Sequence, residues 1–135
     1  MKKYCLDTNI ISYLLKGNNI LYDKLKKEIN KGNRIIINVI TYYEILRGLL
    51  SIKNQKKIEV FKEICNEFDI IEINKDTFEI SANIYVNLKE KGRIIEDADI
   101  FIGAICIEND FILITNNESH FQYIDNLIYE NWIDV

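Results

Sequence analysis

The chain has 135 residues, of which 48% are hydrophobic and 28% are charged, a balance typical of one soluble globular domain and not of a disordered segment. The formal net charge of −4 argues against nucleic-acid binding through a general excess of Lys and Arg. Three widely spaced cysteines and the lack of any apolar run near ~18 residues argue against a disulfide framework, a zinc ribbon and a membrane helix. We therefore expect a cytoplasmic protein with free thiols.

Short apolar segments alternate with longer helical patterns, with no repeat or linker, so residues 1–135 are expected to form a single domain. The first half predicts a strand at 4–6, a helix at 9–16 before Gly17, a helix through Leu21, Leu25 and Ile29 that ends near Gly32, a strand at 35–37, and a helix that Asn38 caps and Gly48 stops. The second half predicts a helix at 52–67, a strand at 70–73, helices at 76–91 and 98–109, and strands at 111–115 and 127–129. This alternation indicates an α/β domain with a mostly parallel sheet.

Asp7 directly follows the first predicted strand, in the run Leu6-Asp7-Thr8-Asn9. A carboxylate at this place can cap the next helix, a role worth ~1 kcal/mol. Because Thr8 and Asn9 are equally able caps, the motif favours Asp7 as a metal ligand. Thr8 and Asn9 are then expected to hold the turn and to orient the carboxylate.

Glu44 lies inside a helical pattern, three residues before Arg47. A weak surface pair between these two side chains explains Glu44 as well as a functional role does. Gly48, one turn further along the same face, fits a cleft that another molecule approaches closely.

Asp97 and Asp99 open the helix predicted at 98–109, whose remainder is almost wholly apolar. Acids in a first helical turn gain ~0.3 to 1 kcal/mol from the helix dipole, so capping is a serious alternative to function. Residues two apart on a helix point in roughly opposite directions. We therefore expect Asp97 to cap the helix and Asp99 to face a cleft.

The strand at 111–115 ends in Thr115-Asn116-Asn117, which is either a polar turn or a set of neutral donors and water-holding groups at the rim of a site. His120 is the only histidine, which excludes a multi-histidine zinc site. We expect His120 to be structural and Phe121 to pack inward.

Asp7, Glu44 and Asp99 each lie where hydrophobic neighbours are expected to bury them. Burying an unpaired carboxylate is costly, so each needs a partner or a cation. Ligands of parallel sheets bind beyond the carboxyl ends of the strands, and all three acids are expected near that edge. One shared divalent cation would satisfy them and would suit phosphodiester hydrolysis.

Four motifs follow one another along nearly the whole chain: Leu6-Asp7-Thr8-Asn9, the segment 41–48 around Glu44, the segment 95–104 around Asp99, and the segment 113–117 followed by His120-Phe121. Together and in this order they resemble the PIN-domain ribonucleases, and most closely the VapC toxins of bacterial and archaeal toxin–antitoxin systems.

The resemblance implies a three-layer α/β/α fold and an endoribonuclease in which Asp7, Glu44 and Asp99 bind Mg²⁺ or Mn²⁺. The products would carry a 5′-phosphate and a 3′-hydroxyl, with tRNA and rRNA as candidate substrates. A VapB-like antitoxin and a second copy of the chain are the implied partners. Many PIN domains carry a fourth acid where this chain has Asn117, so the number of metal ions stays open, and Asp97 is placed to compensate.

Two other interpretations compete with this one. A PIN-like module that binds RNA or a protein without cutting would be favoured by the loss of a metal ligand, and here only the fourth acid is missing. A phosphatase of the haloacid dehalogenase type also begins with a strand and an aspartate. It needs a second acid two residues later, where Asn9 stands.

Overall fold

The side chains of the inner strands alternate between two apolar faces, so the sheet is buried on both sides. In β1 (Lys3–Leu6), Tyr4 and Leu6 pack into one hydrophobic cluster and Cys5 into the other. In β2 (Arg34–Asn38), Ile35 and Ile37 pack into the first cluster and Ile36 packs into the second. Strands with two apolar faces are typical of a parallel sheet covered by helices.

The computed structural model describes residues 1–133, and positions 134 and 135 of the expected domain lie outside them. Its sheet has five strands in the order β3-β2-β1-β4-β5, and every pairing is parallel. The remaining strands are β3 (Asp69–Ile71), β4 (Ile112–Ile114) and β5 (Tyr129–Glu130).

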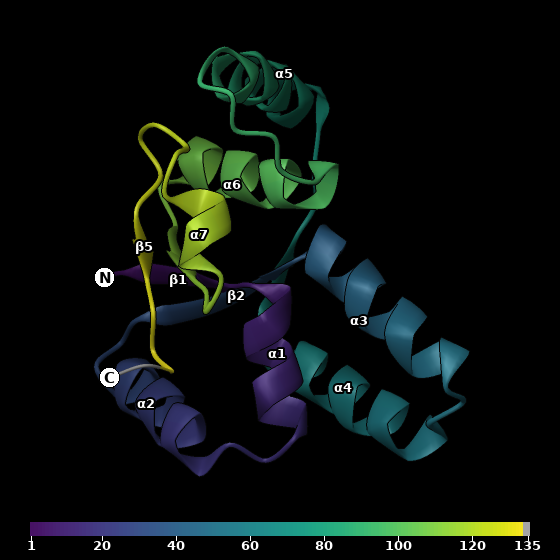
Figure 1. Cartoon of the computed structure of the whole chain (residues 1–135). Coiled ribbons are helices and arrows are strands. Elements are labelled where there is room, and N and C mark those ends of the chain that lie inside the picture. Colours follow the sequence, from purple (N-terminus) through teal and green to yellow (C-terminus); the bar gives the residue numbers. More distant parts are fainter. Residues whose placement is uncertain (134–135) are drawn as a thin grey trace.

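Helices cover both faces of the sheet, as Figure 1 shows. The first cluster is covered by α1 (Thr8–Leu15), α2 (Asn19–Asn30), α3 (Val39–Ser51) and α4 (Gln55–Glu67). The second is covered by α5 (Lys75–Glu90), α6 (Asp97–Asn109) and the single turn α7 (Glu118–Phe121). This arrangement confirms the predicted three-layer α/β/α fold.

The bounds of two predicted elements were shifted: the helix expected at 52–67 begins at Gln55, and the strand expected at 127–129 is Tyr129–Glu130. Two further details were wrong. We expected Gly48 to stop the third helix, but α3 continues to Ser51, and Leu49 just beyond the glycine is buried in the first cluster. The chain turns instead at Lys53, whose φ is +56°, and the side chain of Asn54 caps α4. Helix α7 was not expected, because four residues are too few to show a helical period.

The three cysteines are free and buried, as expected. Among residues 1–133, the structure contains no helix with the length and apolar character needed to cross a membrane.

The strand order reverses at β1, which pairs with β2 on one side and with β4 on the other. In open α/β sheets, the crevice beyond the carboxyl ends of the strands at such a switch point is where ligands bind. Asp7 follows β1 and Thr115 follows β4, and the N–H of Asp7 donates to the carbonyl oxygen of Ile114 at 2.9 Å. The fold thus brings these two sequence motifs together.

Candidate active site

Asp7 is a carboxylate buried at the switch point, with 3% of its surface exposed. Its Oδ1 accepts a 2.8 Å hydrogen bond from the N–H of Thr8, and by this bond Asp7 caps the N-terminus of α1. Its Oδ2 accepts a 2.7 Å hydrogen bond from the hydroxyl of Thr115. Capping and function are therefore compatible, because the cap fixes the carboxylate at the edge of the sheet while each oxygen retains a lone pair.

The pKa of Asp7 shows that the three acids interact. Burial raises the pKa from its ordinary value of 3.8 to about 6. The hydrogen bonds from Thr115 and Thr8 lower it, and repulsion by the carboxylates of Asp99 and Glu44 raises it further. Three acids from distant parts of the chain thus share one electrostatic environment.

Glu44 is held by the hydroxyl of Thr8 and not by an arginine. The hydroxyl of Thr8 donates to Oε1 of Glu44 at 2.7 Å, and the hydroxyls of Thr8 and Thr41 lie 3.1 Å apart. The guanidinium of Arg47 lies over the ring of Tyr43, 5.1 Å from its centroid. The surface pair between Glu44 and Arg47 is therefore not formed among the described residues. Thr41 is buried, and the sequence indicated its place here only through its membership of the motif 41–48, without assigning it a role.

Asp99 contacts His120, which we had expected to be only structural. Nδ1 of His120 lies 2.8 Å from Oδ2 of Asp99 and 2.7 Å from the side-chain amide of Asn117. Helix α7 makes this contact possible, since it carries His120 toward α6 while Phe121 is fully buried, as predicted. Asp99 is thus oriented from α7 as Glu44 is oriented from α1.

The asparagines around the switch point hold the loop that follows β4. Oδ1 of Asn9 accepts a 3.3 Å hydrogen bond from the N–H of Asn116, whose side chain donates to the hydroxyl of Tyr13 at 3.0 Å. The N–H of Asn117 donates to the hydroxyl of Thr115 at 2.9 Å. Asn9 therefore anchors this loop, and the backbone of Thr8 is what binds the carboxylate of Asp7.

Asp97 does not cap α6, and that expectation was wrong. Glu96 occupies the N-cap and makes no side-chain capping bond, while Asp97 is the first residue of the helix itself. The side chain of Asp97 is exposed and lies in the lining of a surface hollow with His120.

The donor set fits a hard divalent cation, because it consists of carboxylate oxygens that no Lys or Arg neutralises among the described residues. No Lys or Arg pairs with Asp7, Glu44 or Asp99 in the described part of the chain. Within that part, Oε2 of Glu44 and Oδ1 of Asp99 accept no hydrogen bond. In the structure, however, no three side chains of His, Cys, Asp or Glu among positions 1–133 lie close enough together to hold one ion. Joint coordination by the three acids therefore stays a prediction.

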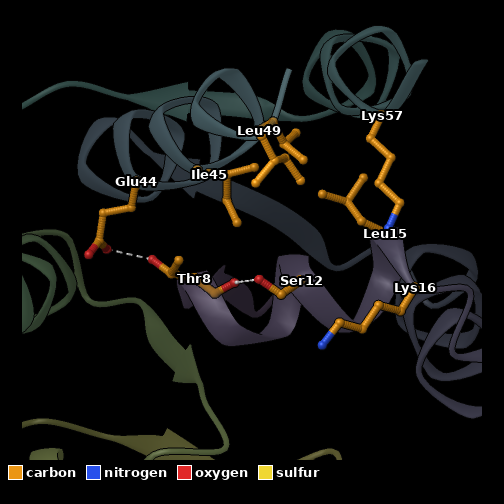
Figure 2. A pocket seen from close by; sticks show the side chains of 10 residues that line it. Thr8, Ser12, Leu15, Lys16, Glu44, Ile45, Leu49 and Lys57 are labelled. Carbon is orange, nitrogen blue, oxygen red and sulfur yellow. Dashed lines mark hydrogen bonds between the residues drawn. The ribbon is translucent and has the colours of Figure 1, made fainter. Parts of the chain in front are cut away.

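A groove of about 290 Å³ leads away from Glu44 between α1, α3 and α4 (Figure 2). Its middle is apolar, with Leu15, Ile45 and Leu49. Its far end carries Lys16 and Lys57, as Figure 2 shows. The groove therefore joins an acidic end to a basic end across an apolar floor.

Comparison with known proteins identifies the family of this chain. Residues 4–127 match the model of the PIN domain family. Ribonuclease VapC2 of Rickettsia felis is 32% identical over 133 residues, which cover 96% of this chain and 97% of the relative. Ribonuclease VapC1 of Methanocaldococcus jannaschii is 31% identical over 112 residues, covering 82% and 80% of the two chains.

A solved structure agrees with these relatives. The crystal structure of VapBC2 from Rickettsia felis bound to a DNA fragment from their promoter contains a chain that is 30% identical. The two chains superpose with a TM-score of 0.85, over 96% of this chain and 98% of that one. The predicted resemblance is confirmed: the chain belongs to the PIN domain family and, within it, to the VapC ribonucleases.

Proposed function

We propose that this protein is a divalent-metal-dependent endoribonuclease that acts in the cytoplasm as the toxin of a toxin–antitoxin pair. The proposal is supported by the burial of the Asp7 carboxylate at the switch point and by the carboxylates of Asp99 and Glu44, whose repulsion contributes to raising the pKa of Asp7. RNA as the substrate class follows from the ribonuclease relatives.

Mg²⁺ or Mn²⁺ would be held by carboxylate oxygens of Asp7, Glu44 and Asp99, since both cations prefer oxygen ligands. A bound divalent cation lowers the pKa of a coordinated water and stabilises negative charge on a phosphate. The protein supplies orientation: the hydroxyl of Thr8 holds Glu44, the hydroxyl of Thr115 holds Asp7, and the imidazole of His120 holds Asp99. Such outer partners fix how a carboxylate presents its oxygens.

The cleavage test compares wild type with Asp7→Asn and Asp99→Asn on RNA, with Mg²⁺ and with a chelator. Wild type is expected to cut only with the metal, and each variant to lose more than the roughly 10- to 100-fold that removal of an outer partner costs. Asp76→Asn is the matched control, because Asp76 is an exposed acid in the first turn of α5. Wild-type rates in the variants would reject the assignment. RNA binding without any turnover would favour a non-catalytic module instead.

The proposed protein partner is a small antitoxin that lies in the groove of Figure 2. Apolar side chains of a peptide suit its floor, a basic side chain suits the end at Glu44, and an acidic one suits the end at Lys16 and Lys57. Lys57→Glu is expected to weaken antitoxin binding by about three- to ten-fold and to leave RNA cleavage by the free toxin unchanged. Unchanged antitoxin affinity would contradict this placement. The homodimer implied by the family resemblance also remains a prediction.

A further inference from the structure

A second hollow, of about 540 Å³, is lined in part by His120, the hydrogen-bond partner of Asp99, and shares no lining residue with the groove of Figure 2. Three parts of the chain line it: α5, the start of α6 with the loop before it, and α7. The lining residues are Tyr85, Ile94, Ile95, Glu96, Asp97 and His120.

His120 links this hollow to the acids of the candidate active site. Its ring lines the hollow while its Nδ1 lies 2.8 Å from Oδ2 of Asp99. Any molecule that contacts the ring of His120 is therefore separated from Asp99 by one side chain. The hollow is thus close enough to hold a part of the substrate adjacent to the reacting phosphate.

The lining of the hollow suits a flat, uncharged ring more than a phosphate. Tyr85 and His120 offer two aromatic rings, and 43% of Tyr85 and 44% of the His120 side chain are exposed. Ile94 and Ile95 add apolar surface, and no Lys or Arg lines the hollow. Aromatic side chains of this kind stack on nucleobases.

The polar side chains of the lining have the chemistry to distinguish between bases. The two lining carboxylates, Glu96 and Asp97, are exposed, and a carboxylate accepts hydrogen bonds from an amino group of a base. Cytosine, adenine and guanine carry an exocyclic amino donor, whereas uracil does not.

We propose that this hollow binds a base of the RNA strand next to the cleaved phosphate and prefers a base with an exocyclic amino group over uracil. The inference rests on the proposed ribonuclease function, because it names where that substrate is read. Tyr85 supplies the stacking surface, Asp97 accepts from the amino group, and His120 connects the bound base to Asp99.

Free nucleosides test the hollow independently of catalysis. Cytidine, adenosine and guanosine are expected to shift the NMR signals of Tyr85 and His120 at millimolar concentration, and uridine to shift them less. Tyr85→Ala is expected to abolish the shifts of His120. Tyr22→Ala serves as the control, since Tyr22 is 53% exposed on α2, outside this lining. The absence of shifts with every nucleoside, or equal shifts with uridine, would overturn the proposal.

RNA substrates test whether the hollow serves cleavage. Wild type, Tyr85→Ala and Tyr22→Ala are each assayed on a single-stranded RNA of defined sequence. They are also assayed on a set of variants of that RNA, each with one abasic site at a position near the cut. Tyr85→Ala is expected to lower kcat/KM on the intact RNA by roughly 5- to 100-fold. One abasic position is expected to lower kcat/KM of wild type by the same factor and to leave kcat/KM of Tyr85→Ala unchanged. Equal kcat/KM in all three proteins would refute the role. Failure of wild type to cut any RNA would instead refute the proposed function, whatever the nucleosides show.

Discussion

The hydroxyl of Thr115 donates a 2.7 Å hydrogen bond to Oδ2 of Asp7, joining residues that are 108 positions apart in the chain. The same oxygen of Thr115 accepts the N–H of Asn117 at 2.9 Å, which leaves its single proton for Asp7. This bond connects the ends of the adjacent strands β1 and β4, where the strand order reverses. It stabilises the charged form of the Asp7 carboxyl, and so it opposes the effect of burial.

Thr115→Val removes this donor at nearly constant volume. The pKa of Asp7, about 6 in wild type, is expected to rise by about one further unit, because a hydrogen bond to a charged group contributes more than one to a neutral group. The midpoint is read from the carboxyl carbon of Asp7 by NMR. Thr115→Ser keeps the hydroxyl and is expected to keep the wild-type midpoint. A midpoint in Thr115→Val at or below that of wild type would contradict the assigned role of this bond.

Asp7→Asn is expected to stabilise the fold at neutral pH when no divalent cation is present. Folding raises the pKa of Asp7 from 3.8 to about 6. The free energy of unfolding of wild type is therefore highest, as far as Asp7 is concerned, below pH 3.8, and this contribution is lost as the pH rises through about 6. The variant lacks this loss, so its free energy of unfolding at pH 8 should exceed that of wild type by about 3 kcal/mol.

Urea denaturation in EDTA at pH 4 and pH 8 measures this difference, with Asp76→Asn as the control. The exposed Asp76 is expected to give no comparable gain at pH 8. A variant Asp7→Asn that is less stable than wild type at pH 8 would show that the buried charge of Asp7 is better compensated than its surroundings indicate.

Thr8→Val tests whether the hydroxyl that holds Glu44 matters for catalysis. The variant keeps the backbone N–H that donates to the capping carboxylate of Asp7, but it loses the 2.7 Å hydrogen bond to Oε1 of Glu44. We expect kcat/KM to fall by roughly 10- to 100-fold and the Mg²⁺ concentration for half-maximal rate to rise. Thr8→Ser should restore both values. If Thr8→Val cleaves RNA like wild type at low Mg²⁺, the hydroxyl has no role in presenting Glu44.

The sequence was informative where a residue's place followed from the end of a strand or the start of a helix. Asp7 follows β1, Glu44 lies early in α3 and Asp99 lies in the first turn of α6, so a parallel sheet was enough to expect them near one edge. The family motifs and the order of the elements pointed the same way, and the three-layer fold was predicted correctly.

The outer partners of the acids were harder to predict because they depend on tertiary packing. Thr41 reads as an ordinary residue of a helix, and only the approach of α1 to α3 places its hydroxyl 3.1 Å from that of Thr8. His120 lies on α7, whose single turn leaves no periodic pattern, so its contact with Asp99 could not be read from spacing. Asp97 was expected to cap α6 because residues two apart on a helix point in roughly opposite directions. The helix instead begins at Asp97, and its N-cap is Glu96, which makes no side-chain capping bond.

Binding of Mn²⁺, measured by calorimetry at pH 8, tests most directly whether Asp7, Glu44 and Asp99 hold a common divalent cation. Wild type and Asp76→Asn should bind the ion equally, and Asp7→Asn, Glu44→Gln and Asp99→Asn should each bind it at least about ten-fold more weakly. Equal affinity in all five proteins, or no binding by wild type at millimolar Mn²⁺, would contradict the shared site on which the proposed ribonuclease depends.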